Sequence, residues 1–446
     1  MKDKKPIDGP IYDARELGTP RMLILGLQHM FAMFGATVLV PALTGLDVAT
    51  TLLFAGLGTL LFHLITKGEV PAFLGSSFAY LAGYWAIAPN GEADLLPYAC
   101  FGVAVSGLMY VILAAIIKSV GVKKVMRFFP PIVTGPIIIA IGLILSSSAI
   151  NNCEANWLVA VVAIVVVVAC NMWGKGMIKI IPILIGVLTS YVVSMIVDPA
   201  SRAKVVETVS NAAWIGIPVH KEATVFGLLS GNFDSGMLVT ACVTIVPLAI
   251  ATMMEHVGDI CAISSTVGRN YLVEPGLNRT LMGDGLATTM AALFGAPANT
   301  TYGENTGVLA LSKVYDPRVI RLAAIFAIVL SFCPKFAALV TAMPTATIGG
   351  VSMILYGMIS AVGVRNVVEN RVDFTNTRNV IIAAIILVLA LGISNSDAGA
   401  VVIGAVSLSG LAVASIVGIV INAILPGKDY EFGVDIQGDT SVNFKV

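Results

Sequence analysis

Five ionisable residues lie within apolar stretches of this sequence, where charged side chains are rare: His29, Glu255, His256, Asp259 and Glu304. Glu255 and Asp259 are four residues apart, which places both carboxyl groups on one face of a helix. A carboxyl group without a counter-charge in a medium of low dielectric constant favours its neutral form, so it can take up or release a proton near neutral pH. This chemistry suits proton-coupled transport.

The stretch from Gly295 to Lys313, GAPANTTYGENTGVLALSK, contains the last of these carboxyl groups. It lies between two long apolar runs, yet it lacks the sequence of a lipid-facing helix. Seven of its residues loosen the backbone or add polar groups: Pro297, Gly303, Gly307, Asn299, Thr300, Thr301 and Asn305. Irregular backbone and a charge at membrane depth are tolerated only inside the protein or beside a water-filled cavity. We therefore expect a functional site here.

Each of these residues also has a structural interpretation. Glu255 then pairs with His29 or His256, and Asp259 only supports Glu255. Glu304 then caps a half-helix that begins after the broken stretch, where the helix dipole favours a carboxylate. His256 then forms a helix–helix hydrogen bond, and two further ionisable groups in the apolar stretches, His63 and Asp284, are assigned to packing or loop anchoring.

The ligand follows from the donors and acceptors that these segments offer. Two carboxyl groups accept hydrogen bonds, and the backbone N–H groups of Phe78 and Gly303 donate them. Phe78, Tyr302 and Tyr356 offer flat apolar surfaces to a ring. The absence of Arg and Lys from these segments argues against an anion. The pattern predicts a small, neutral, cyclic polar solute.

The elements that position these residues belong to a membrane protein. The chain has 446 residues, of which 57% are hydrophobic and 12% charged, and its mean hydropathy is +0.92. Soluble domains are about 25% charged. Twenty-six basic residues balance twenty-six acidic ones, which argues against a nucleic-acid partner. Six cysteines lack metal-binding or disulfide spacing, and no nucleophile motif accompanies the carboxyl groups, so we expect neither a metal, a cofactor nor an enzyme.

A membrane-spanning helix needs about 20 apolar residues. The hydropathy pattern predicts an all-α polytopic protein with fourteen spans, at 22–43, 50–66, 72–88, 97–117, 131–150, 157–173, 178–197, 237–263, 278–294, 297–313, 319–341, 347–364, 379–393 and 399–425. With both termini in the cytoplasm, 22 of the 26 Lys and Arg residues lie on the inner side, as the positive-inside rule requires. The outer side keeps Arg202, Lys204, Lys221 and Lys335.

Three sequence matches, in the same order along the chain, each pair a predicted span with the seventh span after it and so indicate an internal repeat. The matched segments are Leu27–Met30 with Met254–Val257, Pro71–Phe78 with Pro297–Glu304 at an offset of 226, and Pro130 and Gly135 with Pro344 and Gly349. Because seven is odd, the second copy has the opposite orientation in the membrane. Inverted repeats with paired broken spans are typical of secondary transporters. We expect Phe78 and Glu304 to face each other across the pseudo-two-fold axis.

Several runs of the sequence resemble one family of transporters. They are LQHMFAMFGATVLVPAL at 27–43, PAFLGSSFAY at 71–80, MMEHVGDI at 253–260, NTTYGENTGVLALSKVY at 299–315 and GGVSMILYGMI at 349–359. These runs resemble the nucleobase–ascorbate transporter family, specifically its bacterial uracil permease branch, from Leu23 to about Leu425. The most specific run is TTYGEN, because Glu304 resembles the uracil branch, whereas xanthine and urate transporters carry Gln.

The resemblance implies two inverted seven-span repeats, with short β-strands in spans 3 and 10. It also implies a core domain that holds the substrate and a gate domain that moves against it. The expected divisions are an N-terminal cytoplasmic tail at 1–22, core parts at 23–117 and 237–341, gate parts at 118–197 and 342–425, an outer loop at 198–236 and a C-terminal cytoplasmic tail at 426–446. A homodimer through the gate domain is a further expectation from the family.

The resemblance also assigns roles to residues. Glu255 and Glu304 are expected to hydrogen-bond uracil, and the backbone N–H groups of Phe78 and Gly303 to donate to it. His29 is expected in the hydrogen-bond network behind Glu255, with proton coupling assigned to Glu255, Asp259 and His29. The expected pocket lining is completed by Ala36, Tyr302 and Tyr356.

One position departs from the pattern. Where the best-known uracil–proton symporter has His, four residues after the Glu of EHVG, this chain has Asp259, as purine-type relatives do. We expect a uracil:proton symporter of the inner membrane, surrounded by membrane lipid, that works by alternating access. The alternative on the same scaffold is a symporter of xanthine or another purine. A channel or anion transporter of related fold and a membrane-embedded enzyme are the more distant alternatives.

Overall fold

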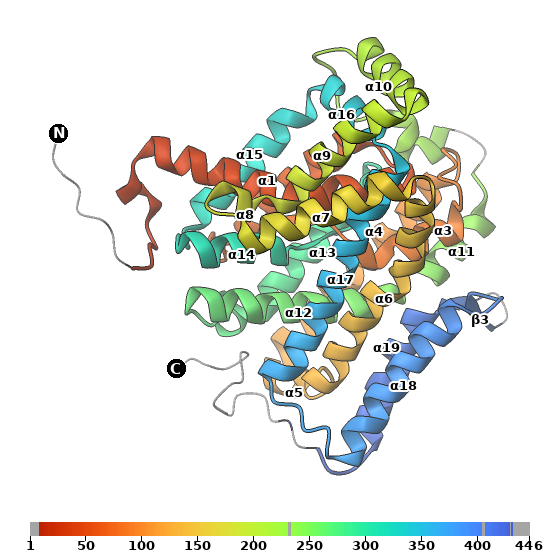
Figure 1. The fold of residues 1–446 in the computed structure, drawn as a ribbon. Helices are drawn as coiled ribbons and strands as arrows, with labels where there is room; N and C mark the ends of the chain where they lie inside the picture. The colour runs from red at the N-terminus through yellow and green to blue at the C-terminus, as the bar shows by residue number, and fades with distance from the viewer. Residues whose placement is uncertain (1–8, 231–232, 404–405, 429, 431–446) are drawn as a thin grey trace.

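The computed structural model describes residues 9–230, 233–403, 406–428 and 430 (Figure 1). Two short sheets accompany the helices, formed by strands β1 (Leu74–Ser76) with β2 (Asn299–Thr301) and β3 (Ala400–Ile403) with β4 (Val406–Ser409). The helices are α1 (Thr19–Thr44), α2 (Val48–Ile65), α3 (Leu81–Ile87), α4 (Leu96–Val120), α5 (Val122–Met126), α6 (Pro131–Glu154), α7 (Trp157–Trp173), α8 (Met177–Ile180), α9 (Pro182–Val197), α10 (Pro199–Asn211), α11 (Ser235–Ile245), α12 (Leu248–Val267), α13 (Leu277–Leu293), α14 (Gly303–Ser312), α15 (Pro317–Ser331), α16 (Pro334–Thr341), α17 (Thr345–Glu369), α18 (Thr377–Ser394) and α19 (Gly410–Ile424).

Within the described part of the chain, six helices are long and apolar enough to cross a membrane: α1, α2, α4, α6, α17 and α18. Counting each of three bent pairs as one span raises the number to nine: α9 with α10, α11 with α12, and α15 with α16. The apolar helices of 78–87, α7 and α19 are shorter. The protein is therefore a multi-pass membrane protein, and the count of fourteen spans stays a prediction.

One predicted span and the predicted outer loop differ from a simple helix and a simple loop. The last predicted span, at 399–425, begins with the antiparallel hairpin of β3 and β4, and only α19 is helical. The apolar–polar alternation of Val406–Ser409, VSLS, and the β-branched residues of Ala400–Ile403, AVVI, suit strands better than an apolar helix. In the predicted outer loop, α10 turns 115° away from α9. Its polar sequence, PASRAKVVETVSN, does not suit a membrane span.

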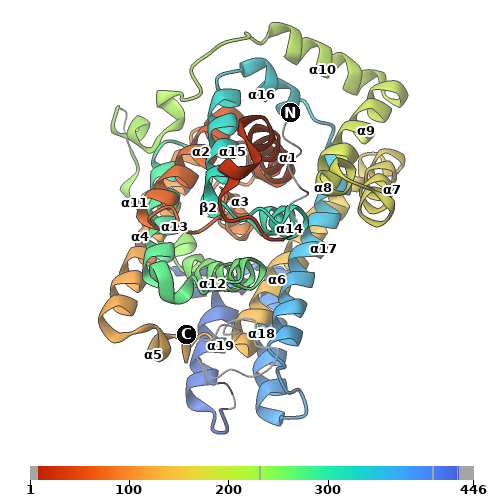
Figure 2. The same cartoon turned by 90° about the vertical axis from the view of Figure 1, so that its left-hand side faces the viewer.

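The helices pack mainly in two sets. In the first, α13 lies against α2 and α4, α15 lies against α1 and α2, and α14 joins α1 to α12. In the second, α17 packs along α6 and also contacts α7, and α18 pairs with α19 (Figure 1). Small residues allow the close packing of α6 and α17, since a Cβ atom added at Gly142 would meet the carbonyl oxygen of Tyr356. Figure 2 shows α18 and α19 at one edge of the molecule.

Strands β1 and β2 lie in the predicted third and tenth spans, as expected. They pair antiparallel, with Gly75 opposite Thr300. Two flanking hydrogen bonds extend the pair: Ser77 N donates to Ala298 O at 2.8 Å, and Tyr302 N donates to Phe73 O at 3.0 Å. The pseudo-two-fold axis relates the two bonds, since Ser77 corresponds to Tyr302 and Phe73 to Ala298, an offset of 225 residues in each case. This offset is one residue smaller than the offset of 226 in the sequence match. The structural counterpart of Phe78 is therefore Gly303, and not Glu304 as the sequence match predicted.

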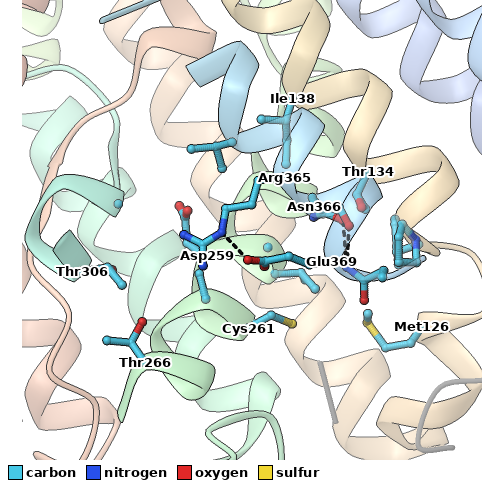
Figure 3. Close-up of a pocket in the computed structure, with 18 of the residues that line it drawn as sticks. Met126, Thr134, Ile138, Asp259, Cys261, Thr266, Thr306, Arg365, Asn366 and Glu369 are labelled. Carbon is cyan, nitrogen blue, oxygen red and sulfur yellow. Dashed lines mark hydrogen bonds and ion pairs between the residues drawn. The ribbon is translucent and has the colours of Figure 1, made fainter. Parts of the chain in front are cut away.

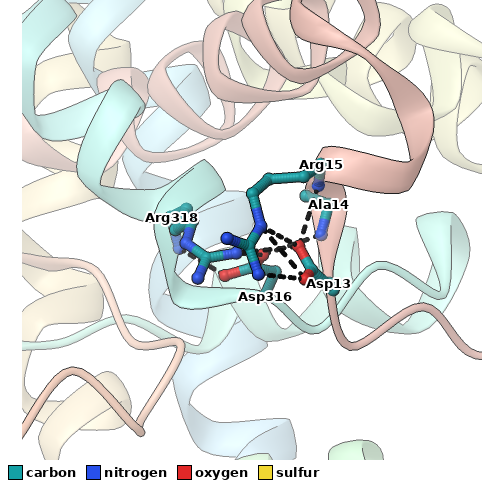
Figure 4. A network of polar contacts seen from close by, with 5 residues as sticks. All are labelled: Asp13, Ala14, Arg15, Asp316 and Arg318. Carbon is teal, nitrogen blue, oxygen red and sulfur yellow. Dashed lines mark hydrogen bonds and ion pairs between the residues drawn. The ribbon is translucent and has the colours of Figure 1, made fainter.

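An N-terminal segment, Ile11–Arg15, closes one end of the first helix set (Figure 4). Ile11 N donates to Lys313 O, and Tyr315 N donates to Ile11 O, both at 2.8 Å. Asp13 accepts hydrogen bonds from Arg15 and from Arg318, whose guanidinium lies 2.8 Å away. Tyr12 Oη donates to Val267 O at the end of α12. These contacts tie the ends of α12 and α14 to the start of α15.

Candidate functional site

A cavity of about 360 Å³ lies where the two helix sets meet. Its walls come from the segment after β1, from α12, from β2 and the start of α14, and from α6 and α17. It contains six residues that the sequence analysis placed in the site: Phe78, Glu255, Asp259, Tyr302, Gly303 and Glu304. Segments more than two hundred residues apart in the sequence, such as those of Phe78 and Glu304, therefore meet at one site.

Helix α12 carries Glu255 and Asp259 on the face that lines this cavity. Both side chains are partly buried, and Oε2 of Glu255 is buried without a hydrogen-bond partner in the described residues. An unpaired buried oxygen costs free energy unless a ligand or water supplies a donor. Glu255 is therefore a ready acceptor for a hydrogen bond from a ligand.

Strand β2 and helix α14 place Glu304 opposite. Tyr302 keeps an extended backbone conformation (φ −100°, ψ 122°), so α14 begins directly afterwards at Gly303. Glu304 lies in the first turn of α14, where the positive end of the helix dipole stabilises a carboxylate. The capping interpretation of Glu304 and its place in the cavity wall are thus compatible.

The backbone N–H groups of Phe78 and Gly303 suit donation to a ligand. Each residue is the first of its helical segment, so its N–H has no acceptor within the helix. A Cβ atom added at Gly303 would meet no atom within 4 Å, which shows that open space lies beside this backbone. The two residues are also structural counterparts in the β1–β2 pair. The site therefore offers two related donors and two carboxyl acceptors.

Tyr302 lines the cavity, but its hydroxyl group is engaged elsewhere. It donates to Ser76 O at 2.9 Å and lies 3.4 Å from the hydroxyl group of Thr37. These bonds brace β1 and α1 against the start of α14. Tyr302 contributes its ring to the site, while its hydroxyl group holds the two strands in place.

Three predicted site residues lie outside the cavity wall. Tyr356 is buried behind Phe78, with the two rings 5.7 Å apart in an edge-to-face arrangement. Ala36 is fully buried in α1. His29 is also fully buried, and its Nδ1 lies 3.1 Å from Nδ2 of Asn305 in α14. The hydrogen bond of His29 thus leads toward the helix of Glu304 rather than toward Glu255.

A buried polar cluster behind the site was not predicted as a unit. Nδ1 of His256 lies 3.1 Å from Asp284 Oδ2 and 3.1 Å from the hydroxyl group of Thr301. The cluster joins α12, α13 and β2 next to the carboxyl groups that line the cavity. His256 is hydrogen-bonded to Thr301 on β2 and contacts Asp284 on α13, and no sequence spacing identifies either partner, because both come from separate elements.

Sequence reasoning missed Arg365, which lines the cavity from α17. The expected span ended at residue 364 and left Arg365 in a cytoplasmic segment, but α17 continues to Glu369. The signal was present in the i, i+4, i+7 spacing of Met358, Val362 and Arg365. The argument that the site contains no Arg or Lys is therefore wrong. Three carboxyl groups against one guanidinium still leave the lining acidic.

A second cavity, of about 260 Å³, adjoins the first (Figure 3). The two share Ile138, Asp259, Gly303, Val362 and Arg365. The second cavity continues toward Met126 and Thr266, near segments whose basic residues predict the inner side. We call it the vestibule. A further cavity, of about 20 Å³, lies beside Phe78 and Ala79.

Comparison with solved structures shows the fold. The transmembrane domain of the cyanobacterial bicarbonate transporter BicA aligns with a TM-score of 0.58, at 13% identity, over 93% of this chain and 99% of that domain. The structure of SLC26A9 aligns with a TM-score of 0.62, at 11% identity, over 92% of this chain and 66% of that one. At these identities the likeness concerns the fold alone.

Comparison with known sequences shows the family. The uracil permease of Bacillus caldolyticus is 40% identical over 431 residues, covering 94% of this chain and 95% of the relative. The uracil permease of Bacillus subtilis (strain 168) is 36% identical, covering 96% and 97%. That of Escherichia coli (strain K12) is 38% identical, covering 90% of each. The model of the Permease family matches residues 20–399, so the chain belongs to this family, the nucleobase–ascorbate transporters.

Proposed function

We propose that the protein is a uracil:proton symporter that imports uracil by alternating access. The main support is the combination of near full-length similarity to three uracil permeases with an acidic cavity that contains Glu304. Uracil is planar and neutral, with two ring N–H groups and two carbonyl oxygens. Glu255 and Glu304 accept from the N–H groups, and the amides of Phe78 and Gly303 donate to the carbonyl oxygens.

The cavity fits this assignment in shape. About 360 Å³ is near the lower end of the range for small-molecule sites. The rings of Phe78 and Tyr302 provide flat surfaces, and Tyr356 supports Phe78 from behind at 5.7 Å. Ala36 is buried in α1, outside the cavity wall. The donors and acceptors then lie at the rim of a ring-sized space.

The transport cycle uses the two helix sets as moving bodies. The core domain comprises spans 1–4 and 8–11, at 23–117 and 237–341, and the gate domain comprises spans 5–7 and 12–14, at 118–197 and 342–425. Together they make fourteen spans in two inverted repeats. The packing of α17 on α6 and of α13 on α4 supports this division. The vestibule on the predicted inner side supports an inward-facing state.

Proton coupling is assigned to Glu255, Asp259 and His29. A proton taken up by this cluster lets the core close on uracil, and its loss inside weakens the site and releases the base. The contact of His29 with Asn305 supports a hydrogen-bonded connection between the cluster and α14, the helix that carries Glu304. Asp259 either carries the proton or supports Glu255.

The protein is assigned to the bacterial inner membrane, with membrane lipid around it and both termini in the cytoplasm. The basic residues on the predicted inner side support this orientation. A homodimer through the gate domain is the expected assembly. Residues 1–22 and 426–446 form the cytoplasmic tails in this assignment, and 198–236 the outer loop.

Uptake of labelled uracil into proteoliposomes with an imposed pH gradient tests the function. We expect saturable uptake that is driven by an acidic outside and competed by unlabelled uracil. Asp259 is shared with purine-type relatives, so xanthine and guanine are tested as competitors in parallel. Stronger competition by xanthine than by uracil would favour a purine symporter and contradict the proposal.

A further inference from the structure

We propose, on the basis of the proposed transport function, that Arg365 is the inner gate residue of this transporter. In the structure its guanidinium pairs with Glu369, and on closure of the vestibule it leaves Glu369 and pairs with Asp259. Arg365 thus closes the passage between the substrate cavity and the vestibule.

The position of the two residues carries the first part of the argument. Asp259 on α12 and Arg365 on α17 are the charged members of the lining that the two cavities share. They belong to opposite helix sets, so a contact between them joins the core to the gate. Figure 3 shows both within the vestibule, together with Glu369. A pair at this place lies across the route that a substrate takes from one cavity to the other.

The present partner of Arg365 is readily exchanged. Its Nε donates to Oε1 of Glu369, one turn along the same helix, and the side chains are 64% and 31% exposed. Exposed i, i+4 ion pairs stabilise by only a few tenths of a kcal/mol. Within the described residues, Asp259 makes no ion pair with a cation. A small movement therefore trades a weak pair for one that neutralises a crowded carboxylate.

Side chains of α6 and α17 already reach the backbone of α12 beside this pair. A Cβ atom added at Gly258 would lie 3.4 Å from Nδ2 of Asn366 and 3.5 Å from Cδ1 of Ile138. Gly258 and Asn366 are the direct neighbours of Asp259 and Arg365 in the chain. Helix α12 is thus in near contact with α6 and α17 at this level, and closure needs only a local approach.

The exchange of Glu369 for Asp259 as the partner of Arg365 couples closure of the vestibule to the protonation state of Asp259. Only ionised Asp259 forms a charged pair with Arg365, so the deprotonated carrier favours a closed vestibule and the protonated carrier an open one. The charged groups that face Asp259 are Glu255 on its own helix, Glu304 on α14, Asp284 on α13, and Arg365 and Glu369 on α17. Arg365 is the cation of this set.

The native thiol of Cys261 reports the state of the vestibule, which it lines. The experiment measures the rate at which a maleimide alkylates Cys261 in the full-length protein, with Cys242 and Cys333 replaced by Ser. Arg365→Gln is expected to raise the rate about twofold, the population shift expected of so weak an ion pair. It should also remove the decrease at higher pH of the rate divided by that of a free thiol at the same pH, because maleimide reacts with the thiolate. Arg365→Lys keeps the charge and restores part of the slower rate.

Glu369→Gln is the opposing control, because it frees Arg365 for Asp259 and is expected to lower the alkylation rate. Equal rates of Cys261 alkylation in Arg365→Gln and the parent protein, or a higher rate in Glu369→Gln, would contradict the proposal that Arg365 is the inner gate residue. Thermal stabilisation by uracil is measured on the same samples. Its retention in Arg365→Gln is expected, and its loss would make Arg365 a binding residue instead. Its absence from the parent protein would overturn the proposed function separately.

Discussion

The imidazole Nδ1 of His256 lies 3.1 Å from Oδ2 of Asp284, and neither side chain has exposed surface. His256 directly follows Glu255 in the chain, and its second contact, Thr301, precedes Glu304 by three residues. His256, held by Asp284 and bonded to Thr301, therefore connects the two segments that carry the cavity-lining residues Glu255 and Glu304.

Removal of this support is expected to destabilise the protein. Asp284→Ala leaves a buried imidazole without its acidic partner, at a cost of about 2 kcal/mol. Asp284→Asn keeps an acceptor oxygen and should lose less. Thermal unfolding in detergent measures both variants. Identical transition temperatures for Asp284→Ala and the parent protein would show that the pair has no structural role.

Gly303→Ala tests whether the open space beside α14 is the ligand site. The added methyl group meets no protein atom, and Ala favours a helix over Gly by about 1 kcal/mol, so the fold should be retained. Uracil binding should weaken about tenfold, because an overfilled site costs about 1–3 kcal/mol. Gly142→Ala is the matched control, since its methyl group meets the carbonyl oxygen of Tyr356 and should lower stability. Unchanged uracil affinity in Gly303→Ala would place the ligand elsewhere.

Asp259→Asn is expected to keep uracil binding and to lose the pH dependence of uptake on either side of neutral pH. A neutral amide at this position cannot exchange a proton. Initial rates of uracil uptake in proteoliposomes across this range measure the effect. A pH profile like that of the parent protein would assign the proton to another group.

Asp13→Asn is the control for this pH profile. The hydrogen bond from Arg15, with the charge of Arg318 nearby, holds the pKa of Asp13 below its usual range. A lowered pKa means that the stabilisation is present above the ordinary value and is lost only as pH falls through the lowered one. Asp13 therefore stays ionised throughout the tested range, and Asp13→Asn should leave the shape of the profile unchanged.

Much of the site was predictable because its polar residues stand out against apolar sequence. Glu255, Asp259 and Glu304 are conspicuous for that reason, and the Pro and Gly residues around them indicate broken spans. The cavity brings all three together with Phe78, Tyr302 and Gly303. A repeat in the sequence also indicated that the Pro71–Tyr80 stretch meets the Gly295–Lys313 stretch.

The rest depends on geometry that local sequence does not encode. A one-residue difference between offsets of 226 and 225 changes the counterpart of Phe78, and only the hydrogen bonds of Ser77 and Tyr302 resolve it. Arg365 was excluded because hydropathy ends a span at its first charge, whereas the helix continues for another turn. The partner of His256 comes from a different helix, so its identity required the packed structure.

Uracil-induced thermal stabilisation of the purified protein, compared with that of Glu304→Ala and Glu255→Ala, tests the central claim most directly. Each variant removes one acceptor, and a hydrogen bond to a charged group is worth about 1.5–3 kcal/mol, so stabilisation by uracil should be lost. Asp259→Asn serves as the variant that retains it. Loss in both glutamate variants with retention in Asp259→Asn is the predicted result, and normal stabilisation of Glu304→Ala by uracil would contradict the account.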